Sequence, residues 1–306
     1  MKKILSAIIA CAVVFTLFTG CSVEKGGKKT IMATLFPQYD FARTIAGDRF
    51  EVKLLLAPGT ESHTYDPGAS DMYAIANSAL FLYTGDEMEP WAGTLISSLG
   101  EDCPEVVDCS QNVPLIKEDH DHEEEEHDHE HEADPHIWLD MDNAKIMAEN
   151  ICSGLCRIDP ENAESYKENC QKLKNELDEL DGEFEQLFSD SDTDTIVFGG
   201  RFSYIYFIER YGLDYVTAYK SCSASAEPSL ADIAEVVDHI NESGAKAIYY
   251  EELSEPKVAR AIAQDTGIKA LEFSTAHNVT AQQLESGVTF IDIMRQNIAN
   301  LREGLC

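Results

Sequence analysis

The sequence predicts an α/β protein of two lobes, each built on a parallel-type sheet, joined by one long interlobe helix. Strand, helix and turn signals alternate in the N-terminal third and again in the C-terminal third of the 306 residues. This alternation is the order of elements in a parallel sheet. The charged stretch between the two regions carries one apolar stripe at helical spacing, as a single amphipathic helix does.

The N-terminus has the pattern of an export signal followed by an anchor point. Residues 1–20 contain two lysines, a short apolar run and then small residues, which is typical of a secretory signal peptide and too short for a membrane span. Cys21 follows directly, in an arrangement that resembles the bacterial lipobox, so we expect a lipidated Cys21. Residues 21–29 are polar and contain glycine, as a membrane-proximal tether should. The expected location is extracytoplasmic, lipid-anchored to the cell membrane.

The N-terminal lobe is predicted over residues 30–157. Two β-rich runs, at residues 29–36 and 51–56, flank a helical stretch at residues 37–47. The other elements expected in this lobe are a loop at residues 57–70, helices at 72–77 and 91–99, a strand at 79–83 and a His/Glu-rich loop at 119–134.

The interlobe helix is predicted over residues 158–190. Asp159 is a good N-cap, and Pro160 suits the first turn. A helix of about 30 residues is about 45 Å long, enough to cross a whole lobe. A coiled-coil segment is the alternative, but the α/β stretches on both sides favour a packed strut. The apolar stripe consists of Tyr166, Cys170, Leu173, Leu177, Leu180, Phe184 and Leu187.

The C-terminal lobe is predicted over residues 191–306 and ends in a closing helix at residues 282–301. The other elements expected there are strands at residues 195–198, 215–218, 245–250 and 269–273 and helices at 202–211, 229–243 and 257–266. We find no residue-level repeat between the two lobes.

The formal net charge of −33 bears on the kind of partner. Such an excess of acid argues against nucleic acid or an anionic membrane surface and fits the attraction of cations. Apart from Cys11 and Cys21, seven cysteines remain, and an odd number cannot all pair within one chain. Cys152 and Cys156 lie one helical turn apart. They are equally interpretable as small buried apolar residues, and we do not interpret them as a zinc site.

The His/Glu-rich loop of the first lobe contains a histidine-rich tract. It mixes imidazole and carboxylate with no apolar residue, so it cannot bury a core and should be solvated. Both groups are ligands for zinc and related divalent ions. We therefore predict a metal-capture loop, with an acidic solvated linker as the alternative. Its histidines are His120, His122, His127, His129 and His131.

Two further histidines are predicted to hold a metal. His63 lies in the loop APGTESHTYDP, directly after the strand at residues 51–56, and parallel sheets bind ligands at this edge. His136 lies in DPHIWLD, framed by Pro135 and Trp138 and adjoining the histidine-rich tract. A single loop histidine is usually only a surface residue. Two of them in tight, apolar-flanked loops favour metal ligands.

Several segments resemble one family in its order and spacing. GTESHTYDP, TGDEMEPW, DPHIWLD, the YGL of residues 211–213 and SAEPSL are similar to motifs of the metal-binding lipoproteins of bacterial ABC importers, the zinc and manganese receptors. The resemblance runs from about residue 29 to the C-terminus. It implies two lobes linked by a rigid helix, a metal in the cleft, and His63 and His136 as the first two ligands. Implied partners are the permease and ATPase subunits of an importer.

The third ligand is where this chain departs from the family. The resemblance places His or Glu at the position of Arg201, and a guanidinium cannot bind a cation. Our candidate from the C-terminal lobe is His277, in the loop after the last predicted strand, although Thr275 occupies the family's acidic position by alignment. A water, Glu251 or Glu252 could complete four-coordination. Three imidazoles suit Zn²⁺, whereas more carboxylate oxygen would favour Mn²⁺.

The expected function is therefore a receptor that delivers a metal ion, most simply Zn²⁺, to an ABC importer, acting as a monomer. A manganese receptor, or a metal-buffering surface adhesin without transport, are the alternatives. We expect no enzyme. The segment HEEEEH (residues 122–127) is one residue longer than the HExxH metalloprotease motif, and neither GxSxG nor a P-loop occurs.

Overall fold

The computed structural model describes residues 29–116, 133–219, 227–253 and 255–306. The predicted signal peptide, Cys21, nearly all of the tether and the five histidines of the capture loop lie outside the described residues. Within them, no helix is both long and apolar enough to cross a membrane.

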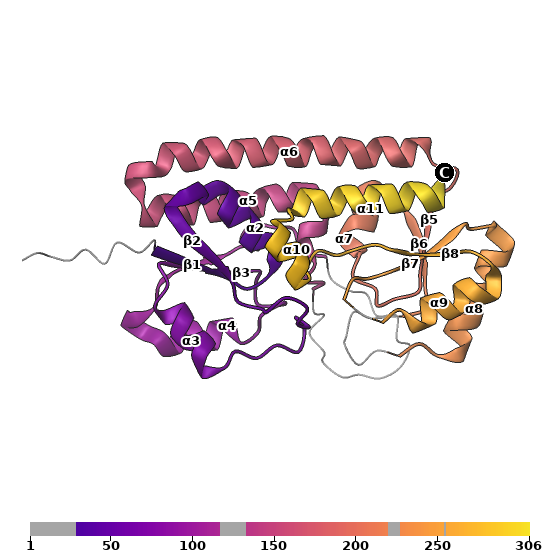
Figure 1. Ribbon diagram of the computed structural model, residues 1–306, viewed down its shortest axis with the longest axis horizontal. Coiled ribbons are helices and arrows are strands. Elements are labelled where there is room, and N and C mark those ends of the chain that lie inside the picture. The colour runs from indigo at the N-terminus through magenta and orange to yellow at the C-terminus, as the bar shows by residue number, and fades with distance from the viewer. Residues whose placement is uncertain (1–28, 117–132, 220–226, 254) are drawn as a thin grey trace, which may run out of the picture.

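Two four-stranded parallel sheets form the centres of two lobes, which confirms the predicted fold class (Figure 1). The strand orders are β2-β1-β3-β4 in the first sheet and β6-β5-β7-β8 in the second. The strands are β1 (Lys29–Ala33), β2 (Phe50–Leu54), β3 (Leu80–Tyr83), β4 (Glu105–Asp108), β5 (Thr195–Phe198), β6 (Asp214–Thr217), β7 (Ala247–Tyr250) and β8 (Lys269–Glu272). Because all pairings are parallel, the carboxyl ends of the strands in each sheet lie at one edge.

Helices cover the sheets and connect the lobes. They are α2 (Phe36–Ala46), α3 (Ala69–Ala76), α4 (Ala92–Leu99), α5 (Met141–Ile158), α6 (Ala163–Asp190), α7 (Ile205–Tyr211), α8 (Leu230–Ser243), α9 (Lys257–Thr266), α10 (Ala281–Ser286) and α11 (Phe290–Leu305). Short 3-10 turns are η2 (Gly47–Arg49), η3 (Gly100–Asp102), η4 (Ile137–Leu139) and η5 (Pro160–Asn162).

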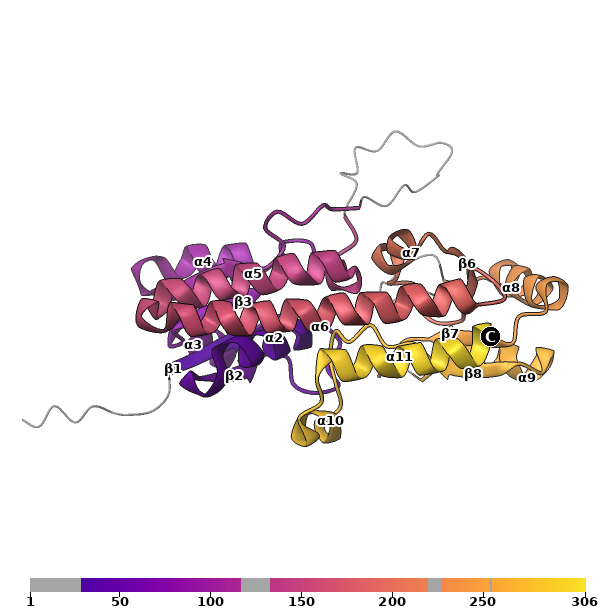
Figure 2. The same cartoon turned by 90° about the horizontal axis from the view of Figure 1, so that it is seen from above.

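The long helix α6 runs across both lobes (Figures 1 and 2). Its predicted apolar stripe is buried along its whole length, from Tyr166 to Leu187. Helices α2 and α5 pack on its N-terminal half, and α7 and α11 pack further along. One continuous hydrophobic core therefore runs through both lobes, with α6 as its shared wall.

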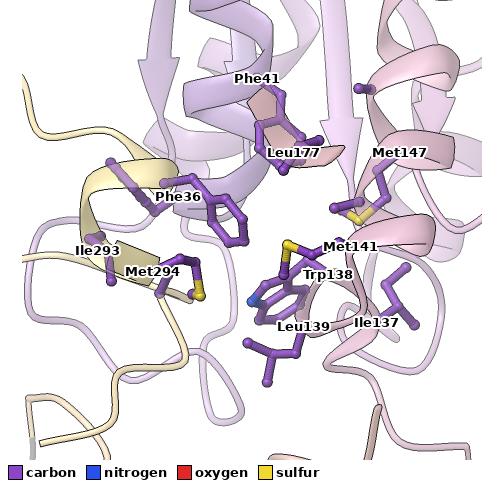
Figure 3. Close-up of a cluster of buried hydrophobic side chains, with 14 of the residues drawn as sticks. Phe36, Phe41, Ile137, Trp138, Leu139, Met141, Met147, Leu177, Ile293 and Met294 are labelled. Atoms are coloured by element: carbon purple, nitrogen blue, oxygen red, sulfur yellow. The ribbon is translucent and has the colours of Figure 1, made fainter. Parts of the chain in front are cut away.

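Side chains from both lobes meet near the middle of this core (Figure 3). Trp138, from the turn after the histidine-rich tract, is fully buried beside Phe36 of the first lobe and Met294 of the second. The lobes therefore pack against each other directly here, in addition to being joined by α6.

The structure corrects three details of the prediction. The expected closing helix at residues 282–301 is two helices, because Gly287 turns the chain with a φ of 75° and Thr289 caps a new helix. Asp159 is not the N-cap of α6; it ends α5, and Pro160 begins the turn η5. Strand β4 and helix α5 were not predicted at all.

Candidate metal site between the lobes

His63 is held in the loop that follows β2, at the carboxyl edge of the first sheet. The imidazole is half-buried, and its ring centroid lies 5.2 Å from that of His136. Burial, followed by the neighbouring His136, lowers the pKa of His63 to about 4. His63 is therefore neutral and able to bind a metal at any physiological pH.

His136 is almost fully buried, at 1% exposure, and is oriented by a carboxylate. Asp134 Oδ1 accepts the His136 backbone N–H at 2.8 Å and lies 3.0 Å from Nδ1 of the same residue. A ring whose Nδ1–H donates to a carboxylate presents Nε2 as its free ligand atom, the arrangement that backs many metal-bound histidines. The second oxygen, Asp134 Oδ2, is buried without a hydrogen-bond partner among the described residues.

His277 has the same kind of support in the second lobe. Its Nδ1 lies 3.0 Å from Glu252 Oε1 and 2.7 Å from Thr275 Oγ1, and Thr275 donates to Glu252 as well. Burial would lower the pKa of His277, but the Glu252 carboxylate outweighs it and raises that pKa. Glu252 responds in the opposite sense. Burial raises its pKa, but His277 and the Thr275 amide overcome this and lower it to about 2.

The loop of His277 docks on both histidine loops of the first lobe. Asn278 Nδ2 donates to the carbonyls of Ala57 and Thr60, at 2.9 and 3.0 Å, just before His63. Trp138 Nε1 donates to the Thr275 carbonyl at 2.7 Å, two residues after His136. His277 also contributes to the lowered pKa of His63. The three predicted histidines thus lie on loops that are hydrogen-bonded to one another across the lobes.

Arg201 stands where the family resemblance implies a metal ligand, and its guanidinium pairs with carboxylates of both lobes. Its Nη1 lies 2.9 Å from Glu61 Oε2 in the His63 loop, and its Nε lies 3.1 Å from Glu251 Oε1 at the end of β7. The Arg201 backbone N–H also donates to Glu251, at 3.0 Å. This close approach requires Gly200, because a Cβ there would lie 1.8 Å from Glu251 Oε2.

Glu251 and Glu252 were the second choices for ligands, and the structure places both in other contacts. Glu251 binds Arg201, and Glu252 accepts from Thr275 and His277. Within the described ranges, no group of three or more His, Cys, Asp or Glu side chains is arranged as a ready metal site. The His63 and His136 rings are the pair the structure brings together. Their spacing allows both to bind one ion at the ~2.0–2.1 Å typical of zinc.

Four supporting residues were missed from the sequence: Glu61, Asp134, Thr275 as a hydrogen-bond partner, and Asn278. Asp134 carried a usable signal, since it lies two residues before His136. The partners of Glu61 and Asn278 are more than a hundred residues away in the chain, so no local pattern marks them.

Two parallel-sheet lobes, a rigid connecting helix and buried imidazoles where the lobes meet define the class of two-lobed solute-binding proteins. Residues 31–304 match the family described as the periplasmic component A of the zinc-uptake complex, ZnuA. The chain belongs to this family.

Two relatives illustrate the sequence similarity. The high-affinity zinc uptake system protein ZnuA of Bacillus subtilis is 31% identical over 322 residues, which cover 100% of this chain and 99% of the relative. The zinc-binding protein AdcA of Streptococcus pyogenes is 30% identical over 316 residues, covering 98% of this chain and 61% of the relative. This chain therefore spans about three fifths of AdcA.

Solved structures of similar proteins share the fold. The metal-dependent lipoprotein YcdH of Bacillus subtilis has a TM-score of 0.78 at 28% identity, covering 91% of this chain and 99% of that one. The Zn(II)-bound ZnuA-like domain of Streptococcus pneumoniae AdcA has a TM-score of 0.76 at 26% identity, with the same coverage. The laminin-binding protein Lmb of Streptococcus agalactiae, titled a bifunctional protein with adhesin and metal transporting activity, has a TM-score of 0.75 at 26% identity, covering 91% of this chain and 100% of that one.

Proposed function

We propose that this protein is an extracytoplasmic zinc receptor that delivers Zn²⁺ to an ABC importer. The observation that carries the proposal is the pair of His63 and His136, whose ring centroids lie 5.2 Å apart. The loop that carries His277 is hydrogen-bonded to the loops of both these histidines. Membership of a zinc-uptake family supports the same cargo. A ligand set dominated by imidazole selects zinc over manganese, which prefers oxygen ligands.

The site residues have distinct roles in this proposal. His63 and His136 bind the ion through one nitrogen each from the first lobe, and His277 binds it from the second. Asp134 and Glu252 orient the rings and strengthen them as donors, because a carboxylate at Nδ1 increases the basicity of the other nitrogen. Water or the Glu61 carboxylate completes the coordination.

The proposal extends to the segments outside the described residues. The histidine-rich tract captures zinc weakly and passes it to the site between the lobes. Cys21 carries a lipid that anchors the receptor near the permease and ATPase subunits of the importer. The role is one of binding without catalysis, and the receptor acts as a monomer.

Calorimetric titration of the chain lacking residues 119–132 tests the tight site. We expect one Zn²⁺ per chain, bound at least a hundredfold more tightly than Mn²⁺, because three imidazoles suit zinc far better. His63→Ala and His136→Ala should each lose this site. His239→Ala is the matched control, since His239 lies on α8 away from the lobe interface.

Equal binding of Mn²⁺ and Zn²⁺, or tight zinc binding in His63→Ala, would contradict the proposal. Adhesion is a second candidate, because the Lmb relative combines both activities in its title. Binding of laminin by the zinc-loaded chain in a surface assay would support that candidate without affecting the zinc site.

A further inference from the structure

Three cysteines on α5 and α6 form a cluster far from the histidines. Cys152 of α5 and Cys170 of α6 line the same pocket on these two packed helices, and the Cys170 thiol donates to the carbonyl of Ala148, one turn before Cys152 on α5. Cys156, one turn further along α5, donates to the carbonyl of Ala163 at the start of α6 and does not line the pocket that Cys152 and Cys170 share.

The cluster is accessible from outside despite being mostly buried. Cys152 and Cys170 are 7% and 5% exposed, and both line a surface pocket of about 310 Å³. Lys167 and Lys174 line the same pocket, as does Glu149, which pairs with Lys174. Thiols that border a cavity beside cationic side chains are the reactive ones in proteins, because the positive charge stabilises the thiolate.

The two ends of the Cys152–Cys170 contact differ in acidity. The neighbouring Cys152 thiol, with a further contribution from Lys174, lowers the pKa of Cys170 against the effect of burial. The neighbouring Cys170 thiol, together with burial, raises the pKa of Cys152. Cys170 is therefore the thiol that ionises first and attacks first.

Geometry selects the interhelical pair over the pair within α5. Side chains four residues apart on a helix have Cβ atoms about 5–6 Å apart, whereas a disulfide needs a Cβ–Cβ distance of about 3.5–4.5 Å. A Cys152–Cys156 bond would have to distort α5. Cys152 and Cys170 lie on separate helices and border one pocket, so rotation of their side chains can change their separation without distorting either helix.

We propose that Cys152 and Cys170 are a modification site that forms a disulfide between α5 and α6 by exchange with a small disulfide entering the pocket. The Cys170 thiolate attacks one sulfur of the external disulfide and releases one thiolate. The Cys152 thiol loses its proton to solvent, attacks the Cys170 sulfur and releases the second thiolate. The two protein thiols lose two electrons, and the external disulfide is reduced to two thiols.

The location of the protein favours this reaction, since disulfides persist outside the cytoplasm. The bond would fasten α5, which begins five residues after His136, to the helix that crosses both lobes. The bond would close the loop between Cys152 and Cys170. Closing this loop restricts the unfolded chain, which stabilises the fold and should raise Tm by roughly 5 °C.

Mass spectrometry on the full chain tests the assignment. The reduced protein is treated with oxidised glutathione, remaining thiols are blocked with N-ethylmaleimide, and the chain is digested. We expect one crosslinked peptide pair containing Cys152 and Cys170, lighter than the sum of its parts by two hydrogen atoms. The Tm increase should disappear on reduction with dithiothreitol.

Two matched variants sharpen the result. Cys156→Ala should form the same crosslink, and Cys103→Ala, outside the cluster, should do so as well. A crosslink of Cys156 to either neighbour, a lasting glutathione adduct on Cys170, or full blocking of all three thiols would each overturn the proposal. The crosslinked peptide and the Tm are measured on the wild-type chain, so the test does not depend on whether a cysteine variant folds.

Discussion

At the scale of single residues, two histidines of the candidate site have one ring nitrogen already in contact with a carboxylate. Asp134 and Glu252 each contact Nδ1 of one imidazole, which leaves Nε2 of His136 and His277 for an ion. Arg201 is the exception in this arrangement, because it contributes a positive charge where the family resemblance implies a ligand. Its charge is balanced by Glu61 and Glu251.

Replacing Arg201 by histidine should restore a full ligand set. We expect Arg201→His to bind zinc at least tenfold more tightly, because a fourth imidazole replaces a cation that repels the metal. Competition with a chromophoric zinc chelator measures this. Arg260→His is the control, since Arg260 forms an exposed pair with Glu255. Unchanged affinity would show that the residue does not face the ion.

Glu89 makes apo-protein stability depend on pH. Its buried carboxyl group accepts hydrogen bonds from the Thr34 hydroxyl and the Thr84 backbone N–H, at 2.5 and 2.9 Å. Burial raises the pKa of Glu89 to about 7. A raised pKa means that the folded state holds the proton more tightly. The contribution of Glu89 to the free energy of unfolding is fully present below about pH 4.5 and is lost as the pH rises through about 7. The total loss is about 3 kcal/mol.

Urea unfolding of the apo-protein between pH 4.5 and 7.5 tests this sign. Glu89→Gln cannot ionise, so its stability should depend less on pH over this range than that of the wild type. Glu87→Gln, an exposed neighbour, should keep the wild-type dependence. Parallel curves for the wild type and Glu89→Gln would exclude Glu89 as the titrating group.

At the scale of elements, α6 does most to hold the two lobes together. Its buried stripe packs on helices of both lobes, and the core that it shares is continuous. Ion pairs add to this contact, since Arg210 of α7 pairs with Asp181 of α6 and Asp142 of α5. The lobes should therefore unfold together.

Leu177→Ala should lower the unfolding free energy by about 2–5 kcal/mol, because it leaves a cavity where a fully buried side chain stood. Denaturant unfolding followed by both fluorescence and circular dichroism measures this. Glu176→Ala, on the exposed face of α6, should change stability by less than about 0.5 kcal/mol. Two separated transitions in the wild type would contradict the shared core.

At the scale of the whole molecule, the high negative charge and the histidine-rich tract serve one purpose in the proposed function. Both raise the local concentration of cations around the protein. The proposed tight site lies on loops of both lobes.

Deleting residues 119–132 should separate capture from binding. The equilibrium affinity of the tight site should stay within about twofold, while zinc loading at low metal concentration should slow several-fold, because the weak ligands that hold ions nearby are gone. Stopped-flow loading measures the rate. A control that replaces the five histidines of the tract with glutamine keeps its length. Loss of tight binding in either variant would contradict this division of roles.

Much of the fold followed from local patterns. Strands β1–β3, the four strands of the second lobe and the stripe of α6 are each readable within a dozen residues, because alternation and helical spacing are local properties. Strand β4 has only two apolar residues, adjacent to each other between acidic ends, so it shows neither an alternation nor an apolar run. The break between α10 and α11 was missed because the periodic pattern continues across Gly287.

The sequence by itself determined the two-lobed α/β class, the long helix, and which loops carry His63, His136 and His277, since these depend on local spacing and on motif order. Only the tertiary structure decided which nitrogen the His136 and His277 rings present, how the His277 loop docks through Asn278, and what neutralises Arg201. Those contacts join residues up to 221 positions apart. They come from the packing of the two lobes, which no local pattern encodes.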